Sequence, residues 1–363
     1  MSPLWREASL EPITFTLDDR SMLRNFLTAD VDLNGKSVLV TGGTGSFGQA
    51  FVRYLLGNHK LRRLVVFSRD EQKQFDMANS LPTSKHPELR YFIGDVRDRD
   101  RLELAMSGID YVIHAAALKH VSIAEYNPFE CIHTNVYGAE NVVRAALRQN
   151  VKRVIALSTD KAANPINLYG SSKLASDKIF VAANHLAGKD GTRFAVVRYG
   201  NVFGSRGSVV PFFQRLIAGG ATKLPITHPD MTRFWIGLGQ GVEFVLSCLS
   251  MMRAGEIFVP KIPSMKVVDL ARCLAPDLPH EIVGIRPGEK LHEVMITADD
   301  ARLTVELDDR FAILPMINID ESMEYWSRHG SVAEAFEYSS DSNSEWLSPE
   351  AMNALLSAHV SQN

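Results

Sequence analysis

The sequence predicts a doubly wound α/β fold of the Rossmann type, in which a parallel sheet carries helices on both faces. Six short runs are apolar throughout, which is typical of strands buried on both faces, and segments with helical spacing lie between them. Right-handed crossovers between such strands give a doubly wound sheet. The predicted strands are residues 37–41, 63–67, 91–93, 111–115, 154–158 and 194–198.

A change in pattern after Asn201 predicts a second, smaller domain. The regular alternation stops there, and Pro211, the glycines at 219–220 and Pro225 break the chain into short elements. The apolar run 256–259 is expected to return to the main sheet as a further strand. The predicted boundaries are 1–33 for an N-terminal arm of unassigned role, 34–203 with 236–260 for the Rossmann domain, 204–235 and 261–350 for a discontinuous α/β substrate-binding domain, and 351–363 for a C-terminal tail.

Composition and charge argue against several classes of protein. A net charge of −3 gives no electrostatic reason to expect nucleic acid as a partner. Three scattered cysteines, without CxxC spacing, argue against a disulfide framework or a metal site and are typical of a reducing compartment. The first thirty residues lack the pattern of a secretory signal, and no run of about 20 apolar residues predicts a membrane span. We expect a cytoplasmic protein.

A glycine-rich loop directly after the first strand predicts a dinucleotide site. Gly42, Gly45 and Gly48 have the spacing that allows a tight turn, close approach of the backbone to a pyrophosphate, and close packing of helix on strand. The phosphates would lie at a helix N-terminus, where free N–H groups attract anions. The alternative is a flexible loop, but the strand before it and the helix after it favour the cofactor. The other predicted contacts in the loop are Thr44, Ser46 and Phe47.

The end of the second strand indicates which dinucleotide is bound. Folds that bind NAD place an Asp or Glu there for the ribose 2′-hydroxyl, whereas this chain has Ser68 and Arg69. A guanidinium and a hydroxyl suit a 2′-phosphate, which a carboxylate would repel. We therefore predict NADP, while the nearby Asp70 keeps NAD open as the alternative.

Further cofactor contacts are predicted where the third and fourth strands end. Asp95 could accept a hydrogen bond from the adenine amino group, or it could instead cap the helix at 98–106. Small side chains at 115–117 would let a flat cofactor lie against the backbone, although three alanines can also be plain packing. The remaining predicted contacts are Val96, Ala115, Ala116, Ala117 and Val202.

Tyr169 and Lys173 predict an acid/base centre. Residues i and i+4 share one face of a helix, and a close ammonium favours the phenolate form of a tyrosine. Such a tyrosine can take a proton from a sugar hydroxyl while a hydride leaves for a nicotinamide. The alternative is an exposed helical face, but Thr159 upstream and the glycine loop favour a paired catalytic role.

Asp160 and Lys161 add a second acid/base pair that a simple dehydrogenase or epimerase does not need. Once C4 of a sugar is a ketone, its C5 proton becomes acidic and the C6 hydroxyl can leave. That elimination requires a base for C5 and an acid for the C6 oxygen, which an amine and a carboxyl can supply. The alternative is a solvated ion pair in a loop, which contributes little to stability.

Longer strings resemble the extended short-chain dehydrogenase/reductase superfamily and, within it, the inverting UDP-N-acetylglucosamine 4,6-dehydratases of pseudaminic acid synthesis. The resemblance covers about residues 35–350 and is more specific than either short motif. The strings are Phe-Ser-Arg-Asp-Glu at 67–71, Ala-Ala-Ala-Leu-Lys-His at 115–120, Ala-Glu-Tyr-Asn-Pro at 124–128, Ser-Thr-Asp-Lys-Ala-Ala-Asn-Pro at 158–165, Arg-Tyr-Gly-Asn-Val at 198–202, Met-Thr-Arg-Phe-Trp at 231–235 and Gly-Ile-Arg-Pro-Gly-Glu-Lys at 284–290.

The resemblance implies a role for each catalytic residue. Tyr169 and Lys173, assisted by Thr159, would oxidise C4 of UDP-N-acetylglucosamine. Lys161 would then take the C5 proton, and Asp160 would protonate the departing C6 hydroxyl. Hydride return to C6 and reprotonation of C5 on the opposite face would give UDP-2-acetamido-2,6-dideoxy-β-L-arabino-hexos-4-ulose. Related retaining enzymes carry a glutamate in place of this lysine, and another inverting branch carries a methionine in place of this tyrosine.

The resemblance also implies substrate contacts. Lys119 and Asn201 would hold the sugar and phosphates, three arginines are candidates for the diphosphate and uridine, and Glu289 could accept from a ribose hydroxyl. The alternative for these residues is surface salt bridging. His114, at a buried strand end, is expected to be a core residue with its hydrogen bonds satisfied. The three arginines are Arg206, Arg233 and Arg286.

Two other functions remain as alternatives to the dehydratase. A UDP-hexosamine 4-epimerase of the same fold would release no water. A non-catalytic NADP-binding regulator could dispense with the Asp160–Lys161 pair or with Tyr169, yet all three are present. The resemblance further implies a homo-oligomer, with a hexamer as one candidate state.

Overall fold

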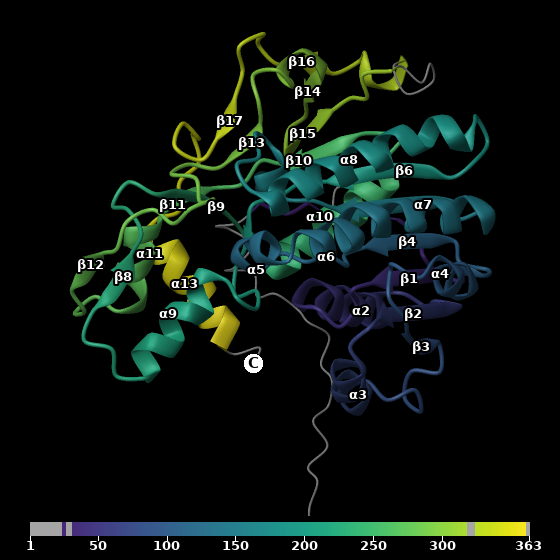
Figure 1. The fold of residues 1–363 in the computed structure, drawn as a ribbon. Helices are drawn as coiled ribbons and strands as arrows, with labels where there is room; N and C mark the ends of the chain where they lie inside the picture. The colour runs from purple at the N-terminus through teal and green to yellow at the C-terminus, as the bar shows by residue number, and fades with distance from the viewer. Residues whose placement is uncertain (1–23, 27–30, 318–323, 361–363) are drawn as a thin grey trace, which may run out of the picture.

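A computed structural model describes residues 24–26, 31–317 and 324–360 (Figure 1). In this part of the chain, the largest sheet has ten strands in the order β16-β14-β15-β10-β6-β5-β4-β1-β2-β3. Within the stretch from β10 to β3, every pair of adjacent strands is parallel. This confirms the predicted fold class, the six predicted strands and the returning strand. Their bounds are β1 Ser37–Thr41, β2 Arg63–Ser68, β3 Leu89–Ile93, β4 Tyr111–His114, β5 Arg153–Leu157, β6 Arg193–Val197 and β10 Ile257–Pro260.

Three antiparallel strands extend this sheet beyond β10, in a segment that the sequence assigned to the substrate-binding domain. They are β15 (Arg310–Ile313), β14 (Thr304–Glu306) and β16 (Gly330–Ser331). These three strands therefore belong to the main sheet and not to the domain predicted for them. Antiparallel strands can be joined by short turns and need no crossover helix, so strands of two to four residues leave no alternating helical pattern in the sequence.

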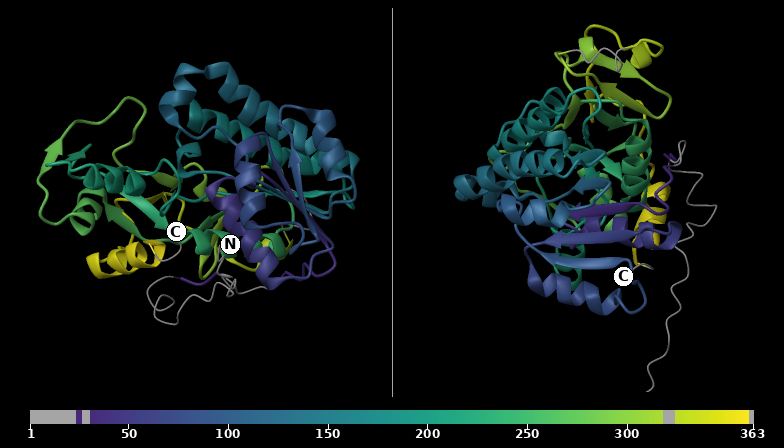
Figure 2. Two further views of the ribbon diagram at one scale, coloured as in Figure 1. Left: turned by 90° about the horizontal axis from the view of Figure 1, so that it is seen from below. Right: turned by 90° about the vertical axis from the view of Figure 1, so that its right-hand side faces the viewer.

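Two layers of helices cover the parallel sheet, as Figure 2 shows. Helices α2 and α10 pack together over one face, and α4, α7 and α8 pack together over the other. The central strands β1 and β2 are accordingly buried along almost their whole length, which explains their unbroken apolar sequence. The bounds of these helices are α2 Ser46–Asn58, α4 Arg99–Met106, α7 Gly138–Arg148, α8 Leu168–Ala187 and α10 Leu238–Met251.

The connections around this framework include several shorter helices. Helix α3 links β2 to β3, while α5, α6 and a π-helical turn η1 lie between β4 and α7. A single 3₁₀ turn, η2, follows β5 and carries the Asp160–Lys161 pair. The bounds are α3 Glu71–Ser80, α5 Val121–Tyr126, α6 Pro128–Ile132, η1 His133–Tyr137, η2 Asp160–Ala162 and a further 3₁₀ turn, η3 Ala301–Leu303.

A smaller lobe lies beside the carboxyl ends of the parallel strands, at the left of Figure 1. Its small sheets and helices enclose two apolar clusters, one around Trp235 and one around Phe213. The order β11-β9-β7 forms one sheet, and β12 pairs with β8 and β13 with β17. The bounds are β7 Asn201–Val202, β8 Leu224–Ile226, β9 Thr232–Ile236, β11 Ser264–Lys266, β12 His280–Ile282, β13 Val294–Ile296, β17 Tyr338–Ser339, α9 Val209–Ala218, α11 Val267–Leu274 and α13 Pro349–Val360.

The two predicted terminal segments differ in how much of them is described. Most of the segment assigned to a C-terminal tail, 351–363, belongs to α13, whose Met352 is buried and which packs on α11. Residues 361–363 lie outside the described part, as do 1–23 and 27–30 of the N-terminal arm. The described part of the arm packs on α10, because Phe26 is buried against Phe244 with ring centroids 4.9 Å apart.

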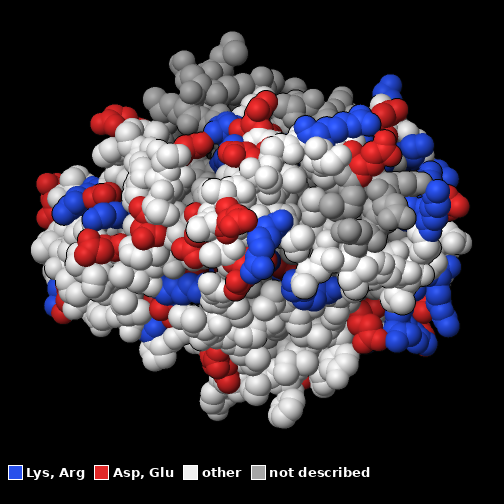
Figure 3. Space-filling model, turned by 90° about the horizontal axis from the view of Figure 1, so that it is seen from above, with Lys and Arg blue, Asp and Glu red and all other residues white. Residues whose placement is uncertain are grey.

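One face of the molecule, shown in Figure 3, carries charges of both signs. On the side shown in Figure 3, basic and acidic side chains alternate, and neither sign forms a continuous area. Among the described residues, no helix combines the length and apolar character needed to cross a membrane. The same residues contain no group of three His, Cys, Asp or Glu side chains arranged to bind a metal.

Candidate active site

A cavity of about 680 Å³ opens where the carboxyl ends of β1, β2, β4 and β5 meet the smaller lobe. Every residue predicted to contact the cofactor lines it. Lys119, Asn201 and Arg206, predicted to contact the substrate, line it as well. The cofactor group is Gly42, Thr44, Gly45, Ser46, Phe47, Gly48, Ser68, Arg69, Asp95, Val96, Ala115, Ala116, Ala117, Tyr169, Lys173 and Val202.

The glycine loop lies so close to neighbouring backbone that side chains would not fit. Gly42 has a φ of +65°, and a Cβ on it would lie 2.8 Å from the backbone nitrogen of Ala116. A Cβ on Gly48 would lie 2.5 Å from the Cα of Gly43. The loop therefore turns tightly against the end of β4 and leads directly into α2, whose N-terminal N–H groups face the cavity end of the fold.

The end of β2 combines hydroxyl groups and cations. The side-chain oxygens of Thr44 and Ser68 are 2.8 Å apart. Asp70 caps α3 by accepting from the backbone N–H of Lys73, and its carboxylate also pairs with the Lys73 ammonium at 2.6 Å. These bonds from Lys73 hold the pKa of Asp70 below its usual value. Lys73 lines the cavity but was not among the predicted contacts.

Asp95 is not the cap of the following helix, so that alternative is wrong. Asp98 caps α4 instead, by accepting from the backbone N–H of Arg101 at 2.9 Å. Asp95 lines the cavity, accepts from the backbone and side chain of Arg97, and lies 3.7 Å from the Arg69 guanidinium. Burial alone would raise the pKa of Asp95, but the bonds from Arg97 outweigh it and the pKa is lowered.

Tyr169 and Lys173 lie on one face of α8 and both line the cavity, so they are not an exposed helical face. The Lys173 ammonium donates to the Leu157 carbonyl at 2.7 Å. Burial raises the pKa of Tyr169 to about 12, and the Lys161 charge and the Thr159 hydroxyl act in the opposite direction. The expected effect of Lys173 on the phenol is therefore carried mainly by Lys161, because Lys173 is held at the end of β5.

Asp160 is buried and Lys161 is partly buried in the cavity wall, so the pair is not a solvated ion pair in a loop. Asp160 is 0% exposed, and its Oδ1 accepts from the Thr159 hydroxyl at 2.8 Å and from Lys161 Nζ at 3.1 Å. Its Oδ2 is buried and has no hydrogen-bond partner within the described residues. Lys161 lines the cavity, whereas Asp160 lies behind it. Lys161 therefore lies in the cavity wall, and its partner Asp160 lies in the protein interior behind it.

A third buried charge beside this pair, Glu293, was missed by the sequence interpretation. Its Oε1 lies 3.0 Å from Lys161 Nζ. Burial by itself lowers the pKa of Lys161, but the carboxylates of Asp160 and Glu293 more than reverse this, and the pKa is raised. The only local sign of it in the sequence is that this glutamate directly precedes the apolar run of β13. A charged side chain buried next to such a strand needs a partner of opposite charge.

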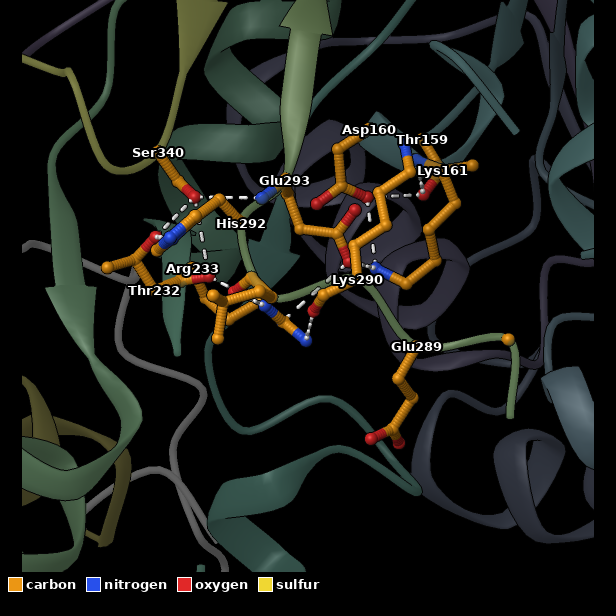
Figure 4. A network of polar contacts seen from close by, with 12 residues as sticks. Thr159, Asp160, Lys161, Thr232, Arg233, Glu289, Lys290, His292, Glu293 and Ser340 are labelled. Atoms are coloured by element: carbon orange, nitrogen blue, oxygen red, sulfur yellow. Dashed lines mark hydrogen bonds and ion pairs between the residues drawn. The ribbon is translucent and has the colours of Figure 1, made fainter. Parts of the chain in front are cut away.

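The predicted substrate contacts fall into two groups. At the cavity, Lys119 Nζ donates to the Arg206 carbonyl at 2.6 Å, and burial lowers the pKa of Lys119. Arg286 and Glu289 lie outside the cavity lining, where they form an exposed ion pair of 3.5 Å. Glu289 points away from the buried polar network in Figure 4. Their contacts with uridine stay predictions.

Arg233 also lies outside the cavity lining, and its N–H groups are used inside the protein. Nη1 donates to the carbonyl of Leu291 at 3.1 Å, and Nη2 donates to that of Lys290 at 3.0 Å. Its Nε lies 3.7 Å from Glu293 Oε1. The described contacts therefore connect Arg233 to the segment 290–293, and its predicted contact with the diphosphate or uridine is not tested by them.

Comparison with known proteins identifies the family. Residues 38–315 match the family described as polysaccharide biosynthesis protein, which is well over half of the 363 residues. The chain belongs to this family.

Two relatives of this chain carry the names of enzymes that act on nucleotide sugars. A Campylobacter jejuni protein named UDP-N-acetylglucosamine 4,6-dehydratase (inverting) is 57% identical over 88% of this chain and 96% of its own length. A Rickettsia prowazekii protein named UDP-glucose 4-epimerase is 43% identical over 77% and 82%. The X-ray structure of Pen from Bacillus thuringiensis is 35% identical, covers 90% of this chain and 100% of its own, and has a TM-score of 0.81. The resemblance inferred from the motifs is confirmed.

His114 is a core residue, as expected from the sequence. Its Nδ1 lies 2.8 Å from the Thr41 hydroxyl, and its side chain is buried between the sheet and Phe180. Burial, and then the Lys173 charge, lower the pKa of His114 to about 3 from its usual 6.5. The folded chain therefore holds this imidazole neutral, while the unfolded chain protonates it in mild acid.

We predict that replacing His114 removes part of the acid sensitivity of this polysaccharide biosynthesis protein. The neutral imidazole contributes its full stability above pH 6.5, and this is lost as the pH falls toward about 3. At about pH 5 the loss through this one group is about 2 kcal/mol. Urea unfolding at about pH 7.5 and pH 5 should show His114→Asn losing correspondingly less stability than the wild type. Equal losses in the two proteins would contradict the buried neutral imidazole.

Proposed function

We propose that the protein is a UDP-N-acetylglucosamine 4,6-dehydratase that inverts C5, with NADP as its cofactor. The observation that carries the proposal is the Asp160–Lys161 pair, with Asp160 buried and Lys161 in the wall of the cavity that Tyr169 also lines. The 57% identity to the Campylobacter jejuni dehydratase supports it. The product would be UDP-2-acetamido-2,6-dideoxy-β-L-arabino-hexos-4-ulose.

The glycine loop and the end of β2 fit NADP. A side chain at position 42 would collide with the backbone at Ala116, so glycine lets the loop turn tightly there and present its backbone to the cavity, as a pyrophosphate site requires. Arg69 and Lys73 supply cations, and Ser68 supplies a hydroxyl, for a 2′-phosphate. The Asp70 carboxylate is occupied by the helix cap and by Lys73, which makes it a poor partner for a ribose hydroxyl. When bound, the nicotinamide accepts a hydride from C4 and returns it to C6.

Tyr169 acts on the C4 hydroxyl. Its phenol takes the hydroxyl proton as C4 becomes a ketone, and the Lys161 charge and Thr159 hydroxyl stabilise the phenolate against the effect of burial. Lys173 is anchored at the Leu157 carbonyl and lines the same cavity, where its cation favours negative charge on neighbouring groups. These residues perform the step that dehydratases and epimerases share.

Asp160 and Lys161 perform the step that only a dehydratase needs. At 3.1 Å, the two groups can share one proton, so an ionised pair can convert to a neutral acid and a neutral amine without solvent. In the neutral form, the amine takes the C5 proton and the carboxyl gives its proton to the departing C6 oxygen. Water leaves, and the pair returns to its ionised form. Asp160 lies behind the cavity wall, so this transfer requires its carboxyl group to turn toward the cavity when substrate is bound; its Oδ2 has no hydrogen bond to break among the described residues.

The epimerase alternative has less support. Epimerisation at C4 needs only the shared step, so a partly buried amine and a buried carboxyl would remain without a task, although burying charges is costly. The identity to the epimerase from Rickettsia prowazekii, 43%, is also lower than that to the dehydratase.

The proposal extends to the setting in which the enzyme works. The motif resemblance supports a homo-oligomer in the cytoplasm that supplies pseudaminic acid synthesis. It also supports contacts of Lys119, Asn201, Arg206, Arg286 and Glu289 with the sugar, phosphates and uridine.

We predict that the purified protein converts UDP-N-acetylglucosamine into a product lighter by one water. In deuterated water, the product should carry deuterium at C5 and have the inverted C5 configuration. Mass spectrometry gives the water loss, and NMR gives the configuration. A product of unchanged mass with inverted C4 would instead support the epimerase, and retention at C5 would contradict the inverting assignment.

We predict that Gly42→Ala abolishes retention of the cofactor while the chain still folds. The substitution forces an unfavourable φ and puts a methyl group 2.8 Å from the Ala116 nitrogen, so the loop must move from the position in which it would bind the pyrophosphate. Gly35→Ala is the matched control, since Gly35 has a φ of +67° but open space around it. Cofactor released by denaturation is measured by chromatography. Full retention by Gly42→Ala would contradict the site, and NAD in the wild-type extract would contradict NADP.

A further inference from the structure

Glu293 is a buried carboxylate whose closest charged partner is the proposed base. Its side chain is nearly inaccessible, at 1% exposure, and its Oε1 lies 3.0 Å from Lys161 Nζ. Its other oxygen, Oε2, is buried and has no hydrogen-bond partner among the described residues. Because an unpaired carboxylate in the interior is costly, the position of Glu293 depends on the cation beside it.

The smaller lobe holds Glu293 from several directions, as Figure 4 shows. Its backbone N–H donates to the Ser340 hydroxyl at 2.9 Å, and the Ser340 N–H donates to its carbonyl at 2.8 Å. Arg233 lies 3.7 Å from Oε1 and ties down the carbonyls of Lys290 and Leu291 just before it. The carboxylate is therefore fixed in place before any substrate arrives.

Lys161 is held between carboxylates from the two parts of the fold. Asp160, from the turn after β5, lies 3.1 Å from Nζ, and Glu293, just before β13, lies 3.0 Å from it. The nitrogen is tetrahedral, with one bond to carbon and two directions taken by these acceptors. One direction remains, and Lys161 lines the cavity. When the proton passes from Nζ to Asp160, the lone pair of the amine points at Asp160, and a turn about the Cε–Nζ bond brings it to the cavity. After that turn, the two N–H groups of the amine point at Asp160 and Glu293.

We propose that Glu293 is a positioning residue for the dehydration step, an inference that rests on the proposed function. It aims the Lys161 amine at C5 and stabilises the ammonium that forms when the amine takes the C5 proton, as the third group does in a nucleophile–base–orienter arrangement. The C5–H electron pair becomes the C5–C6 double bond, the C6–O bond breaks, and the oxygen leaves as water with the Asp160 proton. Glu293 gains and loses no proton itself.

The surrounding charges are consistent with this role. Asp160 and Glu293 supply two negative charges, and Lys161 and Arg233 supply two positive ones. Lys290 is a third cation nearby, but its ammonium donates to the Ala163 carbonyl at 2.6 Å. Arg233 partly neutralises Glu293 and leaves the Asp160–Lys161 pair to share its proton. Removing the Glu293 charge leaves the Lys161 charge and the Thr159 hydroxyl beside Tyr169, so it should affect C5 chemistry much more than the C4 step.

The test separates the two steps in Glu293→Gln, which keeps the size and the acceptor oxygen but loses the charge. The holoenzyme is mixed with UDP-N-acetylglucosamine in deuterated water. Reduced cofactor, followed by absorbance, reports C4 oxidation, and NMR of recovered sugar reports deuterium at C5. We expect C4 oxidation and KM to stay close to those of the wild type, while C5 exchange and kcat fall about 100-fold, since misplacing a reacting group costs that much.

Glu256→Gln is the matched control. Glu256 is also fully buried and has an unpartnered Oε2, but its other oxygen accepts from Trp326 Nε1 and from backbone N–H groups away from the cavity. We expect this variant to lower the Tm and to leave the ratio of C5 exchange to C4 oxidation unchanged. Glu293→Asp, which keeps the charge but withdraws it, should give an intermediate exchange rate and serves as the test if Glu293→Gln does not fold.

The possible results distinguish a failure of the Glu293 role from a failure of the proposed dehydratase function. A wild type that releases no water contradicts the proposed function. A wild type that dehydrates, with Glu293→Gln exchanging C5 at the same rate, overturns only the role of Glu293. Equal losses of C4 oxidation and C5 exchange in Glu293→Gln would show a merely structural carboxylate and would also overturn it.

Discussion

The rest of the site depends on one constraint, which is that the Lys161 ammonium, largely withdrawn from solvent in the cavity wall, needs negative charge beside it. An ammonium taken out of water must be paired, and here its partners are the carboxylates of Asp160 and Glu293. These carboxylates raise the pKa of Lys161 even though burial lowers it. A base of this kind acts only when its proton has somewhere close to go, and Asp160 is that place.

The fold brings these groups together from segments far apart in the chain. The parallel sheet ends its strands at one edge, so the glycine loop after β1, the Ser68–Arg69 pair of β2 and the Thr159–Lys161 turn after β5 all reach one cavity. The smaller lobe then adds Glu293 and Arg233 behind Lys161. The residues proposed for the C4 step thus lie on the sheet side, and Glu293, which we propose positions Lys161, comes from the lobe.

Much of the fold and of the candidate site could be predicted, because the relevant signals are local in the sequence. Buried parallel strands give unbroken apolar runs, and glycine spacing, Tyr169 with Lys173, and adjacent Asp160 and Lys161 are read within a few residues. The short strands β14, β15 and β16 have no such period and were assigned to the wrong part of the fold. Glu293 could not be found, because its significance comes from a contact across more than one hundred residues of chain. For Arg233, the sequence suggested a phosphate contact because arginine suits phosphate. In the structure, its N–H groups donate to backbone carbonyls, which the sequence does not reveal.

The most direct test of the central claim is solvent deuterium exchange at C5 of UDP-N-acetylglucosamine by Lys161→Ala. The account predicts that this variant keeps its cofactor and oxidises C4 more slowly, since Tyr169 loses the charge that favours its phenolate, but incorporates no deuterium at C5. Exchange at the wild-type rate would show that another group is the base, and the lysine between two carboxylates would then not be the agent of the elimination.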